Sequence, residues 1–137
     1  MIWEMYFKGG KAHPSTFGEF VEILLGIPIF VFGLKFTTVH VCSISDGSCQ
    51  IATKENFVGA NGITVNKDKN LVFVNDVSEK QLTILRVEEN FQLVKESVID
   101  LPLMADNIEY DDESDEILIG TIPDIISAAK VWTKRSD

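Results

Sequence analysis

Residues 61–74 read NGITVNKDKNLVFV, and residues 106–120 read DNIEYDDESDEILIG. Each stretch holds two short apolar runs joined by a charged turn, a pattern that predicts a pair of antiparallel strands. Placing Ile63 on Ile108 aligns the two copies and gives a repeat of about 45 residues, the length of one four-stranded blade of a β-propeller. We therefore expect successive propeller blades in this part of the chain.

Short runs of aromatic and β-branched residues continue through most of the chain from Phe30 onward, separated by turn residues. This composition is typical of an all-β fold. The expected strands cover 38–42, 49–53, 62–66, 71–75, 81–87, 92–98, 107–110 and 116–121. The strands at 81–87 and 92–98 lie between the two copies and supply the outer pair that a blade requires. The pattern favours a propeller over a sandwich or a barrel.

Chain length limits how much of a propeller can form. The chain has 137 residues, of which 38–137 are expected to form blades and 1–37 an N-terminal segment with the amphipathic helix described below. Closed propellers have about 4 to 8 blades, so the smallest needs on the order of 180 residues. Because only about two blades fit, we expect a partial propeller. It is either a fragment of a longer protein or a part that associates through its open sheet edges.

An amphipathic helix is expected at 16–25. Its apolar positions recur at helical spacing, and Gly26 and Pro28 follow as stop signals. These positions are Phe17, Phe20, Val21, Leu24 and Leu25. The helix either packs on the β core or contacts a membrane or lipid surface. The apolar stretch that contains it is shorter than the roughly 20 residues needed to span a bilayer, so no transmembrane helix is expected.

The charge of the chain argues against nucleic-acid binding. Lys and Arg number 12 against 21 Asp and Glu, for a formal net charge of -9. Binding to phosphates without sequence preference needs a basic face, which this composition lacks. The first residues contain Trp3 and Glu4 and no basic stretch, so no secretory signal is readable.

The two cysteines are too few for a disulfide-rich scaffold and lack partners for a zinc site. Cys42 and Cys49 flank the turn residues Ser45-Asp46-Gly47. They either face each other across a hairpin as a disulfide or remain two free buried thiols, and geometry decides between these outcomes.

Asn61, Asp106 and Asn107 are the candidate metal ligands. They hold equivalent positions in the two copies, where the innermost strand of a blade begins beside the channel. Amide and carboxylate oxygens suit a hard cation, and calcium takes about six to eight such oxygens at about 2.3–2.6 Å. Three side chains cannot fill that shell alone. The alternative is that all three are turn residues that bond to nearby backbone groups.

The acidic run DDESDE at 111–116 is a poor calcium loop. It lacks the central glycine and the ligand spacing of an EF-hand. We expect a solvated turn there instead.

The motifs ANGI at 60–63, LVFVND at 71–76 and ADNI at 105–108 resemble the paraoxonase/arylesterase family. The likeness extends over 49–124 and is thinner before it. It implies a six-bladed propeller whose channel holds a calcium ion, and hydrolysis of aryl esters or lactones. The calcium ligands of the family carry over to Asn61, Asp106 and Asn107 only. The family is mostly extracellular or membrane-associated, and its lipid-contacting helix matches 16–25.

Several departures from the family concern the catalytic residues. Residues 3–7 read WEMYF where the family has Asn-Asp-His-Tyr-Phe, and Ile122 stands where many relatives have a pocket histidine. Residues 29–37 look like an insertion relative to the family. Neither His13 nor His40 matches the family's histidine motif. We expect the first in a surface loop and the second on a strand face. The isolated chain is therefore expected to be inactive, and a non-catalytic paraoxonase-like scaffold is the alternative function.

Overall fold

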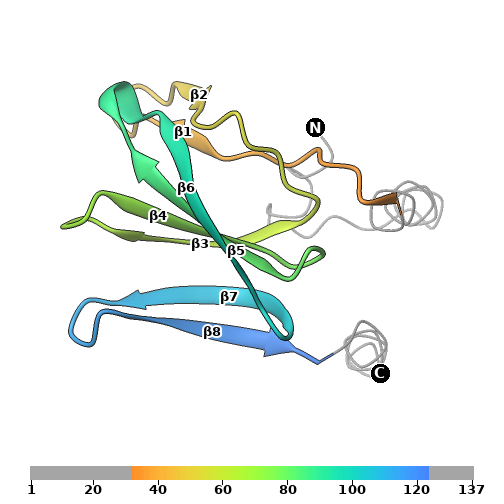
Figure 1. Cartoon of the computed structure of the whole chain (residues 1–137). Helices are drawn as coiled ribbons and strands as arrows, with labels where there is room; N and C mark the ends of the chain where they lie inside the picture. Colours follow the sequence, from red (N-terminus) through yellow and green to blue (C-terminus); the bar gives the residue numbers. More distant parts are fainter. Residues whose placement is uncertain (1–31, 124–137) are drawn as a thin grey trace, which may run out of the picture.

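A computed structural model of the chain describes residues 32–123. This part is all-β and consists of three antiparallel sheets (Figure 1). The strands are β1 (His40–Cys42), β2 (Cys49–Ile51), β3 (Ala60–Asn66), β4 (Leu71–Asp76), β5 (Gln81–Val87), β6 (Leu93–Asp100), β7 (Met104–Asp111) and β8 (Glu116–Ile122), with a short 3-10 turn η1 (Glu89–Phe91). Each expected strand is present. The expected helix at 16–25 and His13 lie outside the described residues.

A four-stranded meander in the order β3-β4-β5-β6 forms the centre of the described part. β4 is its most buried strand, because both of its faces are covered. One face, which carries Val72 and Val74, packs against the segment that contains Val39, Ala52 and Phe57. The opposite face packs against β7, where the rings of Phe73 and Tyr110 stack with centroids 5.9 Å apart.

The hairpins β3–β4 and β7–β8 share one register, displaced by 45 residues. Ala60 pairs with Asp76 as Ala105 pairs with Thr121, and both inner strands carry a bulge directly after this pair. Their turns also match, since Asn70 and Asp115 both adopt a left-handed backbone with φ of 54° and 57°. The predicted repeat is confirmed, and the structure adds a bulge at the same position in both copies.

The three sheets do not close into a ring within residues 32–123. They form one complete four-stranded sheet between two hairpins, β1–β2 and β7–β8 (Figure 1). No helix in this range is long and apolar enough to cross a bilayer.

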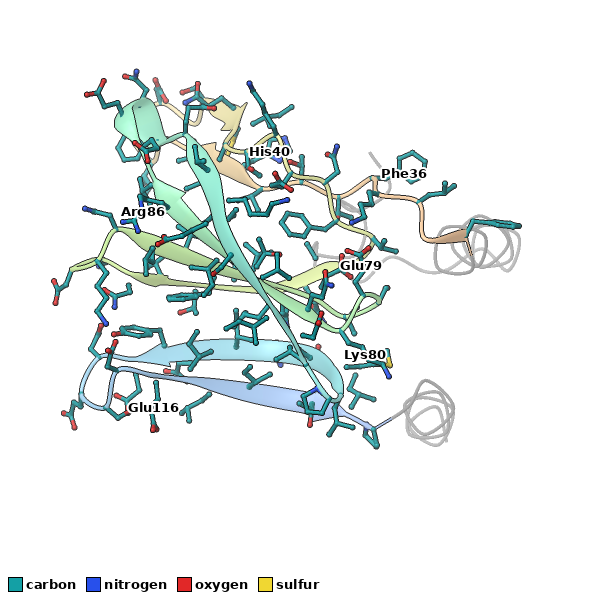
Figure 2. The ribbon with its side chains drawn as sticks, in the orientation of Figure 1. Phe36, His40, Glu79, Lys80, Arg86 and Glu116 are labelled. Carbon is teal, nitrogen blue, oxygen red and sulfur yellow. A yellow bond between two sulfur atoms is a disulfide. The ribbon has the colours of Figure 1, made fainter. Side chains whose placement is uncertain are left out.

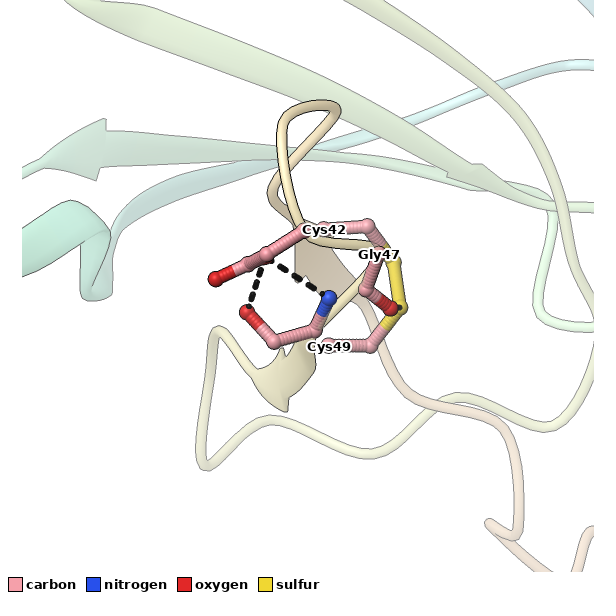
Figure 3. Close-up of a disulfide and its surroundings, with 5 residues drawn as sticks. Cys42, Gly47 and Cys49 are labelled. Carbon is pink, nitrogen blue, oxygen red and sulfur yellow. Dashed lines mark hydrogen bonds between the residues drawn. A yellow bond between two sulfur atoms is a disulfide. The ribbon is translucent and has the colours of Figure 1, made fainter.

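Cys42 and Cys49 form a disulfide across the β1–β2 hairpin (Figure 3). They are directly paired in the strand register, with their Cα atoms 4.1 Å apart. In the turn between them, Gly47 has a φ of 72°, and Ser48 donates its backbone N–H to Asp46 Oδ1 over 2.9 Å. The hydrogen bonds from Ser48 lower the pKa of Asp46 to about 2. Of the two outcomes open from the sequence, the structure contains the disulfide.

Candidate metal centre

The candidate site is built on two equivalent bulges. One interrupts β3 between Ala60 and Ile63, and the other interrupts β7 between Ala105 and Ile108. A bulge turns side chains out of the regular strand alternation, and bulges are frequent beside active sites. β3 and β7 belong to different sheets that pack against each other. The two bulges therefore come together at the same end of β3 and β7.

Gly62 allows this close approach of the two strands. A Cβ atom at Gly62 would stand 2.9 Å from the backbone oxygen of Asp106 and 3.0 Å from the backbone nitrogen of Ile108. Both distances are too short for a carbon atom, and backbone groups cannot move aside as a flexible side chain can. The glycine in the NGI motif therefore serves the packing of β3 on β7.

The structure brings Asn61 and Asp106 into direct contact. Asn61 Nδ2 donates to Asp106 Oδ1 over 2.5 Å. This bond uses the amide nitrogen and one carboxylate oxygen, so Asn61 Oδ1 and Asp106 Oδ2 remain available to a further partner. Asn107 follows Asp106 in the bulge and is exposed. Two of the three predicted ligands thus touch, and the third is adjacent to them in sequence.

The side chain of Asn75 in β4 forms hydrogen bonds to the backbone of both bulges. Asn75 was not among the expected site residues. Its side chain is 0% exposed. Asn75 Oδ1 accepts a hydrogen bond from the backbone N–H of Gly62, and Nδ2 donates to the backbone oxygen of Asp106 over 2.7 Å. One buried amide therefore holds the backbone of both inner strands. The only sequence signal for it is a polar pair, Asn75-Asp76, at the end of an apolar strand.

Asp76 fixes the chain where it enters β3. Its carboxylate is almost completely buried and accepts backbone hydrogen bonds from Val58 at 2.7 Å and Gly59 at 3.1 Å. The N–H groups of Ser78 and Glu79, both at 3.0 Å, bind the same carboxylate. Because all these partners are backbone donors that precede β3 or follow β4, Asp76 has a structural role beside the site.

A second polar cluster joins β3 and β7 at their other end. Lys69 Nζ lies 2.7 Å and 2.5 Å from the two carboxylate oxygens of Asp115, and the hydroxyl of Tyr110 donates to Asp115 over 2.5 Å. Asn66 Nδ2 in turn donates to the Tyr110 oxygen over 2.6 Å. The hydrogen bond to Asp115 raises the pKa of Tyr110 to about 12. The bonds from Lys69 and Tyr110 lower the pKa of Asp115.

His40 and the proposed ligand Asn61 line the same surface hollow. His40 is an exposed residue of β1, as expected (Figure 2). However, it lines a surface hollow of about 230 Å³ together with Asn61 and the apolar residues Val39, Ala60 and Ile63. The hollow therefore borders one of the predicted ligands.

The acidic run at 111–116 spans the turn between β7 and β8, and its residues 112–116 are exposed, as expected for a solvated turn. Asp111 accepts hydrogen bonds from the Glu113 backbone at 3.0 Å and from the Ser114 hydroxyl at 2.7 Å. These bonds lower the pKa of Asp111. Across residues 32–123, no three or more His, Cys, Asp or Glu side chains gather as a metal-binding cluster, a count that does not include asparagine.

The comparisons with known proteins all point to one family. The family model of arylesterases matches residues 14–134. Human serum paraoxonase/lactonase 3 is 33% identical over 104 residues, which cover 76% of this chain and 28% of that protein. The mouse protein of the same name is 38% identical over 69 residues, and dog serum paraoxonase/arylesterase 2 is 33% identical over 69. Each of these two matches covers 50% of this chain and 20% of the relative. The matched region is thus less than a third of each relative's length.

Proposed function

Because the chain belongs to the paraoxonase/arylesterase family, we propose that it is part of a calcium-dependent hydrolase of aryl esters or lactones. In this proposal Asn61, Asp106 and Asn107 are metal ligands, and the described strands are part of a six-bladed propeller. The single observation that carries the proposal is the contact between Asn61 and Asp106, 45 residues apart, at two matching bulges.

The donor set suits calcium. Asn61 and Asn107 offer neutral amide oxygens and Asp106 a carboxylate, which are the hard oxygen donors that calcium prefers. Calcium bound there would supply Lewis acidity that stabilises negative charge on an ester or lactone oxygen. Since calcium takes about six to eight oxygens, the remaining ligands are water or groups other than these three side chains.

The residues around the proposed ligands have separate tasks. Asn75 holds the backbone of both bulges, so Asn61 and Asp106 stay in contact without reorganisation when a ligand arrives. The apolar side of the neighbouring hollow, with Val39, Ala60 and Ile63, suits the hydrocarbon part of an aryl ester or lactone. In this proposal the chain contributes binding and orientation, and no catalytic histidine of the family is assigned to it.

A non-catalytic scaffold of the same family is the second candidate. One observation favours it. Residues 3–7 lack the asparagine and histidine of the family segment. A chain of this kind would keep the fold and the metal ligands without turnover.

Calcium titration calorimetry on the full chain tests the metal site, with Asp106→Asn and Asn61→Ala as variants. We expect each variant to weaken calcium binding at least tenfold, because each removes a ligand or its charge. Asp68→Asn is the matched control, since it removes an exposed carboxylate from the turn at the far end of β3. Equal calcium affinity in all four proteins would overturn the metal assignment.

Turnover of phenyl acetate and of a lactone, with and without a chelator, separates the two candidates. Chelator-sensitive turnover that Asp106→Asn abolishes supports the hydrolase. Calcium binding without turnover in the full chain, and in any longer natural product that contains it, supports the scaffold.

A further inference from the structure

The pair Asn61-Gly62 is chemically the most reactive asparagine pair of the chain. Among the asparagines of the sequence, only Asn61 is followed by glycine. Glycine has no side chain that would hinder the approach of its backbone nitrogen to the side chain of the preceding asparagine. An asparagine before glycine therefore loses its side-chain amide, a reaction called deamidation, more readily than an asparagine before a larger residue.

Deamidation at this pair needs only water as a co-reactant. The backbone nitrogen of Gly62 forms a bond to Cγ of Asn61, and the bond between Cγ and Nδ2 of Asn61 breaks. Nδ2 leaves as ammonia together with the proton that the Gly62 nitrogen loses. Water then opens the resulting succinimide ring and leaves aspartate or isoaspartate at position 61.

The attacking nitrogen of this reaction is held by Asn75. Gly62 donates its backbone N–H to Oδ1 of Asn75, whose side chain is 0% exposed. Asn75 Nδ2 donates to the backbone oxygen of Asp106 over 2.7 Å, so the amide of Asn75 is fixed at both of its ends. When the Gly62 nitrogen turns toward Cγ of Asn61, the buried Oδ1 of Asn75 loses its partner, which costs free energy.

The leaving group is held by Asp106. Asn61 Nδ2 donates to Asp106 Oδ1 over 2.5 Å. A hydrogen bond to a charged acceptor is stronger than one between neutral groups, so this bond restrains the rotation of the Asn61 side chain. Cγ of Asn61 is thus restrained together with the nitrogen that would attack it.

The packing of β7 restrains the backbone between the two residues. Figure 1 shows the hairpin β7–β8 facing β3 and β4 of the central sheet. The approach is so close at Gly62 that a Cβ atom there would stand 2.9 Å from the Asp106 oxygen and 3.0 Å from the Ile108 nitrogen. Ring closure requires rotation of the peptide group between Asn61 and Gly62, and the backbone of β7 opposes this rotation.

We propose that Asn61 is a deamidation site of this chain and that Asn75 and Asp106 keep its rate low in the folded protein. The protection depends on neither calcium nor ester hydrolysis. Its consequence for the metal site rests on the proposed function. Deamidation replaces the amide of Asn61, which donates to Asp106, with a carboxylate that the charge of Asp106 repels.

Peptide mapping by mass spectrometry tests the proposal on the full chain, incubated at mildly alkaline pH. In urea, where the fold is lost, Asn61 should deamidate faster than every other asparagine. In the folded wild type its rate should be at least about tenfold lower. Folded Asn75→Ala should deamidate at Asn61 about tenfold faster than the folded wild type, and tenfold corresponds to about 1.4 kcal/mol, the scale of one buried hydrogen bond.

Asp106→Ala is a second variant, which frees the Asn61 amide and leaves the buried Asn75 in place. It should also raise the Asn61 rate, so the proposal stays testable if Asn75→Ala does not fold. Urea unfolding curves confirm which variants are folded during the incubation.

Val72→Ala is the matched control. Val72 lies in β4, as Asn75 does, and belongs to the hydrophobic core. Its truncation lowers the free energy of unfolding without removing either hydrogen bond, so the Asn61 rate should stay near the wild-type value. Equal Asn61 rates in the folded wild type and the folded Asn75 and Asp106 variants would overturn the proposal. The same holds for a Val72→Ala rate as high as theirs, or a wild-type rate that is equal in the folded and unfolded protein.

Discussion

Asn75 in β4 donates its side-chain Nδ2 to the backbone oxygen of Asp106 in β7 over 2.7 Å. The other end of the same amide accepts the backbone N–H of Gly62 in β3. Because Asn75 is completely buried, neither bond can be replaced by water without opening the sheet. The two bulges that carry the proposed ligands are therefore joined through the side chain of a neighbouring strand.

Replacing Asn75 with alanine should lower the free energy of unfolding by about 2 kcal/mol, because the half-buried N–H of Gly62 and C=O of Asp106 lose their partner. Urea unfolding measures the change. Asn61→Ala is the contrasting variant, since Asn61 is exposed and should alter stability by less than about 0.5 kcal/mol while it weakens calcium binding. Equal stability of the two variants would contradict the role assigned to Asn75.

Gly62→Ala should lower the free energy of unfolding by about 1–3 kcal/mol, because its Cβ meets backbone atoms of β7 at 2.9 and 3.0 Å. Gly120→Ala in β8 is the matched control. Its Cβ would stand 3.6 Å from the nearest atom, the Asn107 oxygen, which is ordinary contact. Thermal or urea unfolding of both variants compares them, and a Gly120→Ala protein less stable than Gly62→Ala would contradict the close approach of β3 and β7.

Tyr110 should ionise near pH 12, above its ordinary value of 10.0, because its hydroxyl donates to Asp115. The raised pKa means that this contact stabilises the fold fully below about pH 10 and is lost as the pH rises toward 12. Spectrophotometric titration of a Tyr6→Phe protein follows Tyr110 alone, since the chain has 2 tyrosines. Asp115→Asn should return the midpoint toward 10, and an unchanged midpoint would exclude the hydrogen bond as the cause.

For Asp115 we predict that the stability it contributes is lost at acid pH, the opposite of the dependence expected for Tyr110. Its pKa is lowered, chiefly by Lys69, so its contribution to stability is present above its ordinary value of 3.8 and is lost as the pH falls through the lowered pKa. The stability difference between wild type and Asp115→Asn should therefore shrink below about pH 4. Unfolding curves at several pH values measure it. A difference that stays constant from pH 7 to pH 2 would show that the carboxylate makes no charge-dependent contact.

Removing the Cys42–Cys49 disulfide should lower the free energy of unfolding by about 2 kcal/mol, as expected for closure of a short loop. The Cys42→Ser/Cys49→Ser variant measures this under non-reducing conditions. Added reductant should destabilise the wild type and leave the variant unchanged. A thiol count on the unfolded, unreduced wild type should be zero, and two free thiols would contradict the bridge.

The described strands and their repeat were readable from local patterns in the sequence. Alternating apolar residues, turn residues and the 45-residue spacing act over a few neighbours, and they placed each strand to within about three residues. The same spacing identified Asn61 and Asp106 as equivalent, and the structure brings them together.

Other features depended on residues that are distant in sequence and close in space. Asn75 contacts Asp106 across 31 positions, so its role became visible only once β4 and β7 were packed together. The choice between a disulfide and two thiols depended on the pairing of Cys42 with Cys49, and the position of His40 beside Asn61 depended on how β1 packs on the sheet. Local patterns specify strands and turns, whereas distances between strands follow from packing, which no short stretch of sequence encodes.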